Sequence, residues 1–279
     1  MAGKQRSYHD APDPSDESPL SVAVTARDRD VMTMVRRAIE RNDVMLAYQP
    51  VMQMAAQDRP AFYEGFVRLV DETGRVIPAG QFMPTVETQE IGRVIDCLAL
   101  DMGFNALRHD PALRLSLNMS ARSIAYPRWT RLMRRGLAAD PTAGERLILE
   151  ISEASAMVMP DVVSVFMRQL QPAGVAFALD DFGSGLTSFR HLRDFYFDLV
   201  KIDGSFIRGI ADTADNQCLV AALIGIARQF DMLVVAESVE TAADADWLAR
   251  AGVDCLQGYF YGAPTATPPW AVPETRIAV

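Results

Sequence analysis

Polar side chains that could bind metal ions interrupt, or directly follow, the apolar runs of this 279-residue chain. Carboxylate and amide oxygens are the ligands that hard divalent ions prefer, and the set contains no histidine, which favours Mg²⁺ or Mn²⁺ over Zn²⁺. Five carboxylates at one site would repel one another, whereas two divalent ions and one lysine would balance their charge. Two such ions, about 4 Å apart, can clamp a phosphodiester and activate a water molecule. The candidates are Glu64, Asn118, Glu150, Asp180, Asp181, Lys201, Glu237 and Gln257.

Strand geometry decides which of these side chains can face one site. In the segment Leu115–Ser120, period-two alternation directs Asn118 to the face opposite the leucines. Asp180 and Asp181 are adjacent, so both can face one site only if the strand ends there, with the following glycines supplying that freedom. Lys201 lies in a buried run, where a lysine needs an anionic partner. Singly, Asn118 could be a turn residue, the aspartates a helix N-cap and the others solvated strand ends.

Eight short apolar runs, most of them separated by roughly 20–40 residues with helical periodicity, provide the main fold signal. Repeated strand-then-helix units are typical of a largely parallel sheet. Eight units in about 250 residues favour an α/β barrel of the TIM (β/α)8 type over an open doubly wound sheet, although periodicity alone leaves that choice open. In a barrel the polar strand ends converge on one mouth. The runs are Leu46–Met52, Phe62–Val70, Leu113–Met119, Leu147–Ile151, Val175–Leu179, Leu199–Ile202, Met232–Ala236 and Cys255–Gln257.

One connection is too short for a parallel crossover, because only residues 53–61 separate the first two runs. These two strands are expected to be antiparallel, which predicts a modified TIM-type (β/α)8 barrel with an antiparallel first hairpin. We assign residues 27–265 to this barrel. Aspartates and prolines predict a disordered N-terminal tail over residues 1–26, and the later prolines predict an irregular C-terminal tail over residues 266–279.

The composition argues against several classes of protein. A net charge of −9, from 27 basic and 36 acidic residues, with no basic cluster argues against DNA or RNA as a partner. No run approaches about 18 apolar residues, so no membrane segment is expected. Cys97, Cys218 and Cys255 are widely separated and form no disulfide framework or zinc pattern, which favours a reducing, cytoplasmic location.

Seven motifs in this chain, in the same order, resemble those of the EAL-domain family of cyclic-di-GMP phosphodiesterases. The resemblance extends over roughly residues 28–265, nearly the whole chain. The matching segments are Tyr63–Arg68, Leu117–Ser120, Glu150–Glu153, Asp180–Gly183, Lys201–Asp203, Ala236–Glu240 and Gln257–Tyr259.

The resemblance implies hydrolysis of cyclic-di-GMP to linear pGpG with two Mg²⁺ or Mn²⁺ ions per site. By this resemblance Glu64, Asn118, Glu150, Asp180, Asp181 and Glu237 ligate the ions. Glu64 and Glu237 also count as catalytic, together with Lys201 and Gln257 beside the attacking water. Glu153 is implied to stabilise the loop that begins at Asp181. Arg68, Gln49 and Phe66 are the implied substrate contacts, and a guanidinium fork suits a phosphate.

Three departures from the family pattern affect affinity and rate rather than the presence of metals. Gly65-Phe66 stands where Ala-Leu is usual, Leu186-Thr187 replaces Tyr-Ser, and Ser238 replaces a glycine, where it could strain the backbone. An alternative is therefore a weak or inactive receptor for cyclic-di-GMP, or a protein-interaction module. Replacing Glu64 by Ala distinguishes them, because only an enzyme would lose hydrolysis.

The resemblance also implies partners for the chain. The family commonly dimerises near the loop that follows Asp181, so we expect a homodimer. Because no input domain is recognised in this sequence, any regulation is expected to come from a regulatory protein partner, from expression or from dimerisation.

Overall fold

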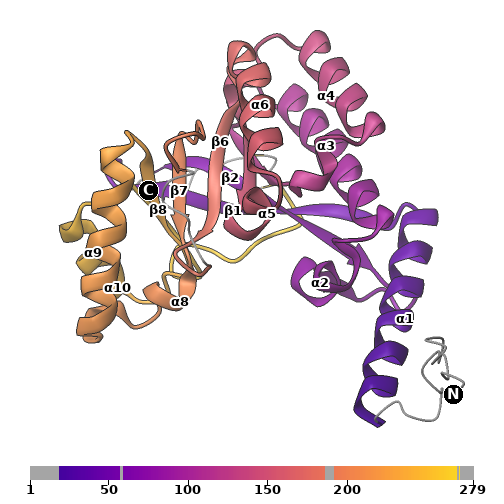
Figure 1. Cartoon of the computed structure of the whole chain (residues 1–279), viewed down its shortest axis with the longest axis horizontal. Helices are drawn as coiled ribbons and strands as arrows, with labels where there is room; N and C mark the ends of the chain where they lie inside the picture. The colour runs from indigo at the N-terminus through magenta and orange to yellow at the C-terminus, as the bar shows by residue number, and fades with distance from the viewer. Residues whose placement is uncertain (1–18, 57–58, 186–191, 269, 271–279) are drawn as a thin grey trace, which may run out of the picture.

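The computed structural model describes residues 19–56, 59–185, 192–268 and 270, in which nine strands form a single sheet. The strand order is β1-β9-β8-β7-β6-β5-β4-β2-β3, and an additional pairing of β1 with β2 closes the ring (Figure 1). β1 runs antiparallel to both β2 and β9, whereas β2 and β4 to β9 all run parallel to one another around the ring. The predicted TIM-type barrel with an antiparallel first hairpin is confirmed. The strands are β1 Val44–Gln53, β2 Pro60–Val70, β3 Val76–Pro78, β4 Leu115–Asn118, β5 Leu147–Ser152, β6 Ala176–Phe182, β7 Leu199–Ile202, β8 Leu233–Ala236 and β9 Cys255–Gln257.

Helices surround the barrel, with α3 and α4 on one side and α9 and α10 on the other (Figure 1). Short polar side chains begin several of them, because they accept a hydrogen bond from a free backbone N–H of the first turn. Ser152 caps α5, Asp203 caps α8 and Thr241 caps α10. The α-helices are α1 Pro19–Glu40, α2 Met83–Val86, α3 Glu90–His109, α4 Pro127–Ala139, α5 Glu153–Val158, α6 Pro160–Leu170, α8 Gly204–Ile207, α9 Ala214–Gln229 and α10 Ala242–Ala251.

Two apolar layers lie on opposite faces of the barrel wall. The larger core lies between strands and helices and includes Leu115 and Leu117, which alternate with inward-facing residues of β4. A smaller core fills the barrel and includes Ile148, Ala178 and Val235. None of the helices in the described residues is long and apolar enough to cross a membrane. The cytoplasmic location stays a prediction.

The β1–β2 hairpin is longer than the other strands and extends beyond the barrel. Its distal part carries β3, and Leu69 and Ile77 form a separate core with Val35 of α1 and Phe82. The hairpin has no crossover helix, and the C-terminal segment lies there instead. Thr265 pairs with Tyr48 of β1, and the Trp270 ring packs edge-on against Tyr48 at 4.7 Å between ring centroids.

The helix α1 corrects the predicted N-terminal tail of residues 1–26, because it begins at Pro19 and not near residue 27. Val35 and Ala38 of this helix are fully buried, and adding residues to a helix that packing already stabilises costs little compared with nucleating one. Residues 1–18 and 271–279 lie outside the described residues. Trp270 packs on the barrel, so the irregular C-terminal segment is in contact with the domain beyond residue 265.

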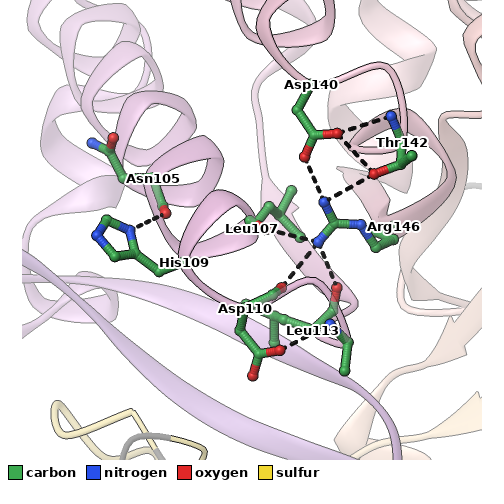
Figure 2. A network of polar contacts seen from close by, with 9 residues as sticks. Asn105, Leu107, His109, Asp110, Leu113, Asp140, Thr142 and Arg146 are labelled. Atoms are coloured by element: carbon green, nitrogen blue, oxygen red, sulfur yellow. Dashed lines mark hydrogen bonds and ion pairs between the residues drawn. The ribbon is translucent and has the colours of Figure 1, made fainter.

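Arg146 is the hub of a network of polar contacts (Figure 2). It directly precedes β5 and therefore lies at the amino-terminal end of that strand, opposite the mouth. Its Nη1 donates to the carbonyls of Leu107 at 2.8 Å and Asp110 at 3.1 Å, near the end of α3. Its Nη2 donates to Asp140 Oδ2 at 2.6 Å. The Arg146 side chain is only 11% exposed, so its removal would leave partly buried acceptors unpaired.

We expect Arg146→Met to lower the free energy of unfolding by about 2–4 kcal/mol, because methionine keeps the stem but donates no hydrogen bond. Urea unfolding followed by circular dichroism measures the change. Arg134→Met, at an exposed position of α4, is the matched control and should change stability by less than about 0.5 kcal/mol. Equal effects of the two substitutions would contradict the role of this hub.

Asp96 of α3 is buried and accepts hydrogen bonds from Ser120 N at 3.0 Å and Ser123 Oγ at 2.5 Å. Burial raises the pKa of its carboxyl to about 6. A raised pKa means that the folded state binds the proton on Asp96 more tightly than the unfolded state does. Protonation of Asp96 therefore stabilises the folded state at low pH, and this contribution is lost as the pH rises through about 6.

The free energy of unfolding of the parent is therefore expected to fall by about 1–2 kcal/mol between about pH 5 and about pH 8, and this fall should be absent in Asp96→Asn. The amide oxygen can accept both hydrogen bonds without carrying a charge. Urea unfolding at the two pH values measures the difference. A parent and variant with parallel pH dependence would show that Asp96 does not titrate in this range.

Candidate metal centre

A polar layer lies directly above the apolar filling of the barrel. On each parallel strand, the candidate residue is two positions closer to the mouth than an inward-facing residue, and on the reversed β1 it is two positions earlier. Period-two alternation therefore directs these side chains into the same space. The pairs are Phe62 and Glu64, Ser116 and Asn118, Ile148 and Glu150, Ala178 and Asp180, Leu199 and Lys201, Val235 and Glu237, Cys255 and Gln257, and Val51 and Gln49.

Lys201 is the centre of this layer and is fully buried. Its Nζ lies 2.6 Å from Glu237 Oε1, 2.7 Å from Glu64 Oε2 and 2.8 Å from Glu150 Oε2. Asp180 Oδ1 is farther away, at 3.6 Å. Four carboxylates, three from β2, β5 and β6 and one directly after β8, thus surround one ammonium group and supply the anionic partners that a buried lysine needs.

Amide side chains orient Glu64 from both sides. Asn118 Nδ2 donates to Glu64 Oε1 at 2.6 Å, and Gln257 Nε2 donates to Glu64 Oε2 at 2.7 Å. Gln257 Nε2 also lies 3.1 Å from Gln49 Oε1, and Gln49 Nε2 donates to the Gly262 carbonyl at 2.9 Å. These contacts fix the orientation of the Glu64 carboxylate.

The charges of the cluster perturb one another strongly. Burial raises the pKa of Glu64, but the Lys201 charge and its hydrogen bonds outweigh burial and hold that pKa below its usual range. Burial and then the Glu64 charge raise the pKa of Glu150 well above normal. Burial also raises the pKa of Glu237 to about 8. Burial opposes the charge on Lys201, but Asp180 and the other carboxylates raise its pKa well above normal. One lysine therefore does not neutralise the whole cluster.

The geometry at Asp180 and Asp181 differs from the expected strand end. β6 continues to Phe182, with an irregular register between Leu179 and Phe182. Asp181 itself has a left-handed conformation, with φ of 56°, which aspartate tolerates better than most residues. This conformation, more than the glycines that follow, brings two adjacent aspartates to one site.

Several carboxylate oxygens of this cluster lie close enough together to ligate a cation. Each of Asp180, Asp181 and Glu237 offers a carboxylate oxygen, and these oxygens lie within 4.8 Å of one another. Among the described residues, buried Glu150 Oε1 has no hydrogen-bond partner, and buried Asp180 Oδ1 has only the 3.6 Å ion pair with Lys201. Buried carboxylate oxygens are costly unless paired, and such hard ligands suit Mg²⁺ or Mn²⁺.

Glu153 begins α5 and is only 1% exposed. Its Oε2 accepts a hydrogen bond from Gly183 N at 3.0 Å, which ties the segment after Asp181 to the end of β5. Leu186, one of the departures from the family pattern, lies outside the described residues.

Two of the expected substrate contacts, Phe66 and Arg68, lie on the part of β2 that extends beyond the mouth, whereas Gln49 lies on β1 opposite Glu64. Glu64, Phe66 and Arg68 share one face by strand alternation. The Arg68 guanidinium lies 5.3 Å from the Phe66 ring centroid and donates to the Val67 carbonyl at 3.0 Å. The position of Glu64 early in its run is explained by the length of β2, which runs parallel to β4 and continues past the mouth.

Two polar residues near this site were not selected from the sequence. Ser116 Oγ is buried next to Glu64 in the β2–β4 register and has no partner in the described residues. Strand alternation places it on the inner face, but a serine alone gives no chemical signal. Arg208 donates to Ser238 Oγ at 3.1 Å, a contact that no sequence spacing indicates.

The chain is a closed TIM-type α/β barrel with a carboxylate cluster around a buried lysine at the carboxyl ends of its strands. Enzymes with TIM-type barrels have their active sites at this end of the barrel. The sequence model of the EAL domain matches residues 32–264 of this chain, and the chain belongs to the EAL-domain family.

Curated relatives include enzymes of cyclic di-GMP turnover. The cyclic di-GMP phosphodiesterase PdeF of Escherichia coli is 30% identical over 238 residues, which cover 84% of this chain and 32% of PdeF. The bifunctional diguanylate cyclase/cyclic di-GMP phosphodiesterase MucR of Pseudomonas aeruginosa is 32% identical, with 82% and 34% covered. This chain spans about a third of the length of these relatives.

Solved structures similar to this chain include single EAL-type domains bound to c-di-GMP. The PaMucR phosphodiesterase in complex with c-di-GMP has a TM-score of 0.75 and 29% identity, with 85% of this chain and 98% of that chain covered. The FimX EAL domain from Pseudomonas aeruginosa bound to c-di-GMP has a TM-score of 0.77 and 25% identity, with 85% and 97% covered.

Proposed function

We propose that this chain hydrolyses cyclic-di-GMP to linear pGpG, using two Mg²⁺ or Mn²⁺ ions per site. The observation that carries this proposal is the convergence of Glu64, Glu150, Asp180 and Glu237 on Lys201, with buried carboxylate oxygens that accept no hydrogen bond from the described residues. Membership of the EAL-domain family and the names of the relatives supply the substrate.

In this proposal Glu64, Asn118, Glu150, Asp180, Asp181 and Glu237 hold the ions. When bound, the ions supply positive charge at the phosphodiester and lower the pKa of the attacking water. The carboxylates with raised pKa values support this assignment, because a cation would stabilise their charged forms.

Lys201 and Gln257 act on the reacting groups directly. Lys201 stays protonated because the surrounding carboxylates raise its pKa, so it donates hydrogen bonds and does not serve as a base. Gln257 Nε2 donates a hydrogen bond to Glu64. The buried Gln257 Oε1 has no hydrogen-bond partner in the described residues, so it is free to accept a hydrogen bond from the attacking water.

Arg68 binds a phosphate of the substrate in this proposal. Its guanidinium carries two or more donors in a planar fork, and stacking near Phe66 reduces the freedom that it would lose on binding. Phe66 then contributes apolar contact for a guanine. Gln49 makes its two hydrogen bonds within the protein, so we assign it to positioning Gln257 beside the substrate.

The test is chromatographic analysis of purified protein incubated with cyclic-di-GMP and Mg²⁺ or Mn²⁺. A parallel reaction in which the metal is chelated shows whether product formation depends on it. Metal-dependent formation of pGpG is the expected result. Binding of the nucleotide without product would favour the alternative of a receptor. Absence of both would leave a protein-interaction module as the better explanation.

We also propose that the chain forms a homodimer through α9. This helix exposes apolar and small residues, among them Leu219, which is 48% exposed. A β-carbon on Gly183 would lie only 2.9 Å from Leu223 Cδ1, so α9 packs directly on the segment that follows Asp181. A dimer at this face would couple assembly to the metal centre.

Leu219→Glu is expected to convert the dimer to a monomer, because a charge would be buried in the interface. Sedimentation velocity measures the change, with Leu233→Glu, at an exposed position of β8 that is 54% exposed, as the control. A parent chain that sediments as a monomer would contradict the proposal.

A further inference from the structure

Ser238, directly after Glu237, has an unfavourable backbone conformation. Its φ is 56°, in the left-handed region that side chains other than Gly, Asn and Asp rarely adopt. Asn42, Asp181 and Asp231 are the other non-glycine residues with positive φ in the described part of the chain. Ser238 is therefore the one member of this group whose type does not favour the conformation, so its surroundings must hold it there.

Two contacts hold the Ser238 side chain. Arg208 Nη2 donates to Ser238 Oγ at 3.1 Å, and Arg208 Nε lies 3.6 Å from Glu240 Oε1. On its other side, Ser238 packs against the α-carbon of Gly204, at the start of α8. A β-carbon on Gly204 would lie 2.2 Å from Ser238 Oγ and 2.6 Å from Ser238 Cβ, so the serine occupies the space that a side chain at position 204 would need.

These contacts join the two turns that flank the carboxylate cluster. Gly204 follows β7 by two residues, and β7 carries Lys201; Ser238 follows β8 and Glu237. The neighbouring backbone is also fixed, because Glu237 N donates to the Ile202 carbonyl at 3.4 Å and Val239 N donates to the Gln257 carbonyl at 2.9 Å. Within this frame the Glu237 carboxylate lies 2.6 Å from Lys201 Nζ.

We infer that Ser238 is a positioning residue, which fixes Glu237 for metal binding by locking the turn after β8 against Gly204 and Arg208. The inference rests on the proposed function for the role of Glu237. Glycine at position 238 would accept the same φ without strain, but would fill no space against Gly204 and would offer no acceptor to Arg208. Serine at position 238 therefore restricts the turn after β8 through its contacts with Gly204 and Arg208, whereas glycine would leave the turn freer to move.

The steric part of the inference predicts that substitutions at positions 204 and 238 are coupled. Gly204→Ala is expected to lower the midpoint of thermal unfolding by about 4 °C or more, because its methyl group would overlap Ser238. Ser238→Gly alone should stay within about 2 °C of the parent, since relief of strain offsets the entropy of the added glycine. The double variant should recover at least half of the loss caused by Gly204→Ala.

The positioning part is tested by Mn²⁺ binding to the metal-free protein without nucleotide, measured by isothermal titration calorimetry. Ser238→Gly and Arg208→Ala should each weaken binding by about tenfold, because residues that orient a metal ligand typically contribute that much. Both variants should keep a thermal midpoint near that of the parent. Arg250→Ala, on the exposed side of α10, is the matched control and should bind Mn²⁺ as the parent does.

Each part has an outcome that overturns it. Gly204→Ala that is equally destabilising with and without Ser238→Gly would overturn the steric lock. Unchanged Mn²⁺ affinity in Ser238→Gly would overturn the positioning role, as would a parent that binds no Mn²⁺. A parent that binds Mn²⁺ tightly but forms no pGpG would overturn the proposed function instead, while the effect of Ser238 on binding would still stand.

Discussion

Replacing Glu64 by Gln is expected to lower the rate of pGpG formation by more than about a hundredfold. Substitution of a residue that merely orients a metal ligand costs about 10–100-fold, and this substitution removes the charge of a proposed ligand itself. Glutamine keeps the size of the side chain, so Lys201 retains Glu150 and Glu237 as partners at 2.8 Å and 2.6 Å. Product formation at saturating cyclic-di-GMP and Mn²⁺, measured by chromatography, gives the rate.

The matched control is Glu40→Gln, at the exposed end of α1 and outside the barrel. It removes the same charge and should leave the rate unchanged. Circular dichroism and nucleotide binding must show that the Glu64→Gln protein is folded. A variant that forms pGpG at the parental rate would exclude Glu64 from the chemistry, and with it the proposed metal centre.

Replacing Lys201 by Met should affect stability as well as activity. Removal of the ammonium leaves Glu64, Glu150, Asp180 and Glu237 buried around an uncharged side chain. Breaking a buried ion pair costs about 3–5 kcal/mol, which corresponds to a fall of about 6 °C or more in the thermal midpoint of a domain of this size. Product formation should be lost.

Divalent ions should partly restore the stability of the Lys201→Met protein, because their charge can replace that of the lysine among the carboxylates. The thermal midpoint with and without Mn²⁺ measures this, and the increase should be larger than in the parent. Leu199→Met, an inward-facing apolar substitution on the same strand, is the control and should cost less than about 1.5 kcal/mol. A metal-free Lys201→Met protein as stable as the parent would mean that the carboxylates do not need this cation.

Local sequence patterns were sufficient to predict the barrel and its polar layer. Each of the eight apolar runs overlaps a barrel strand, and the short connection between the first two correctly predicted an antiparallel hairpin. Alternation also placed Asn118 and Lys201 on the inner face, where they contact Glu64. These predictions hold because burial on one or both faces of a strand is recorded residue by residue in the sequence.

Other features were missed because they depend on how distant segments meet. The three-residue strand β3 has no periodicity of its own, and it forms because β2 extends beyond the barrel and offers it an edge. The start of α1 at Pro19 depends on a helix already stabilised by packing near Val35. The predicted cytoplasmic location, the dimer and the regulatory partner stay predictions.

The sequence by itself determined the fold class, the carboxylates that face the barrel mouth and the lysine among them, because residue type and strand period are local properties. Only the tertiary structure decided which carboxylate oxygens contact Lys201 and which accept no hydrogen bond from the described residues. Lys201 contacts Glu64 across 137 positions in the chain, Asp181 reaches the site through a left-handed backbone, and Ser238 fills the space above Gly204. Such contacts depend on strand register and loop geometry, which closure of the barrel fixes and which no spacing along the chain encodes.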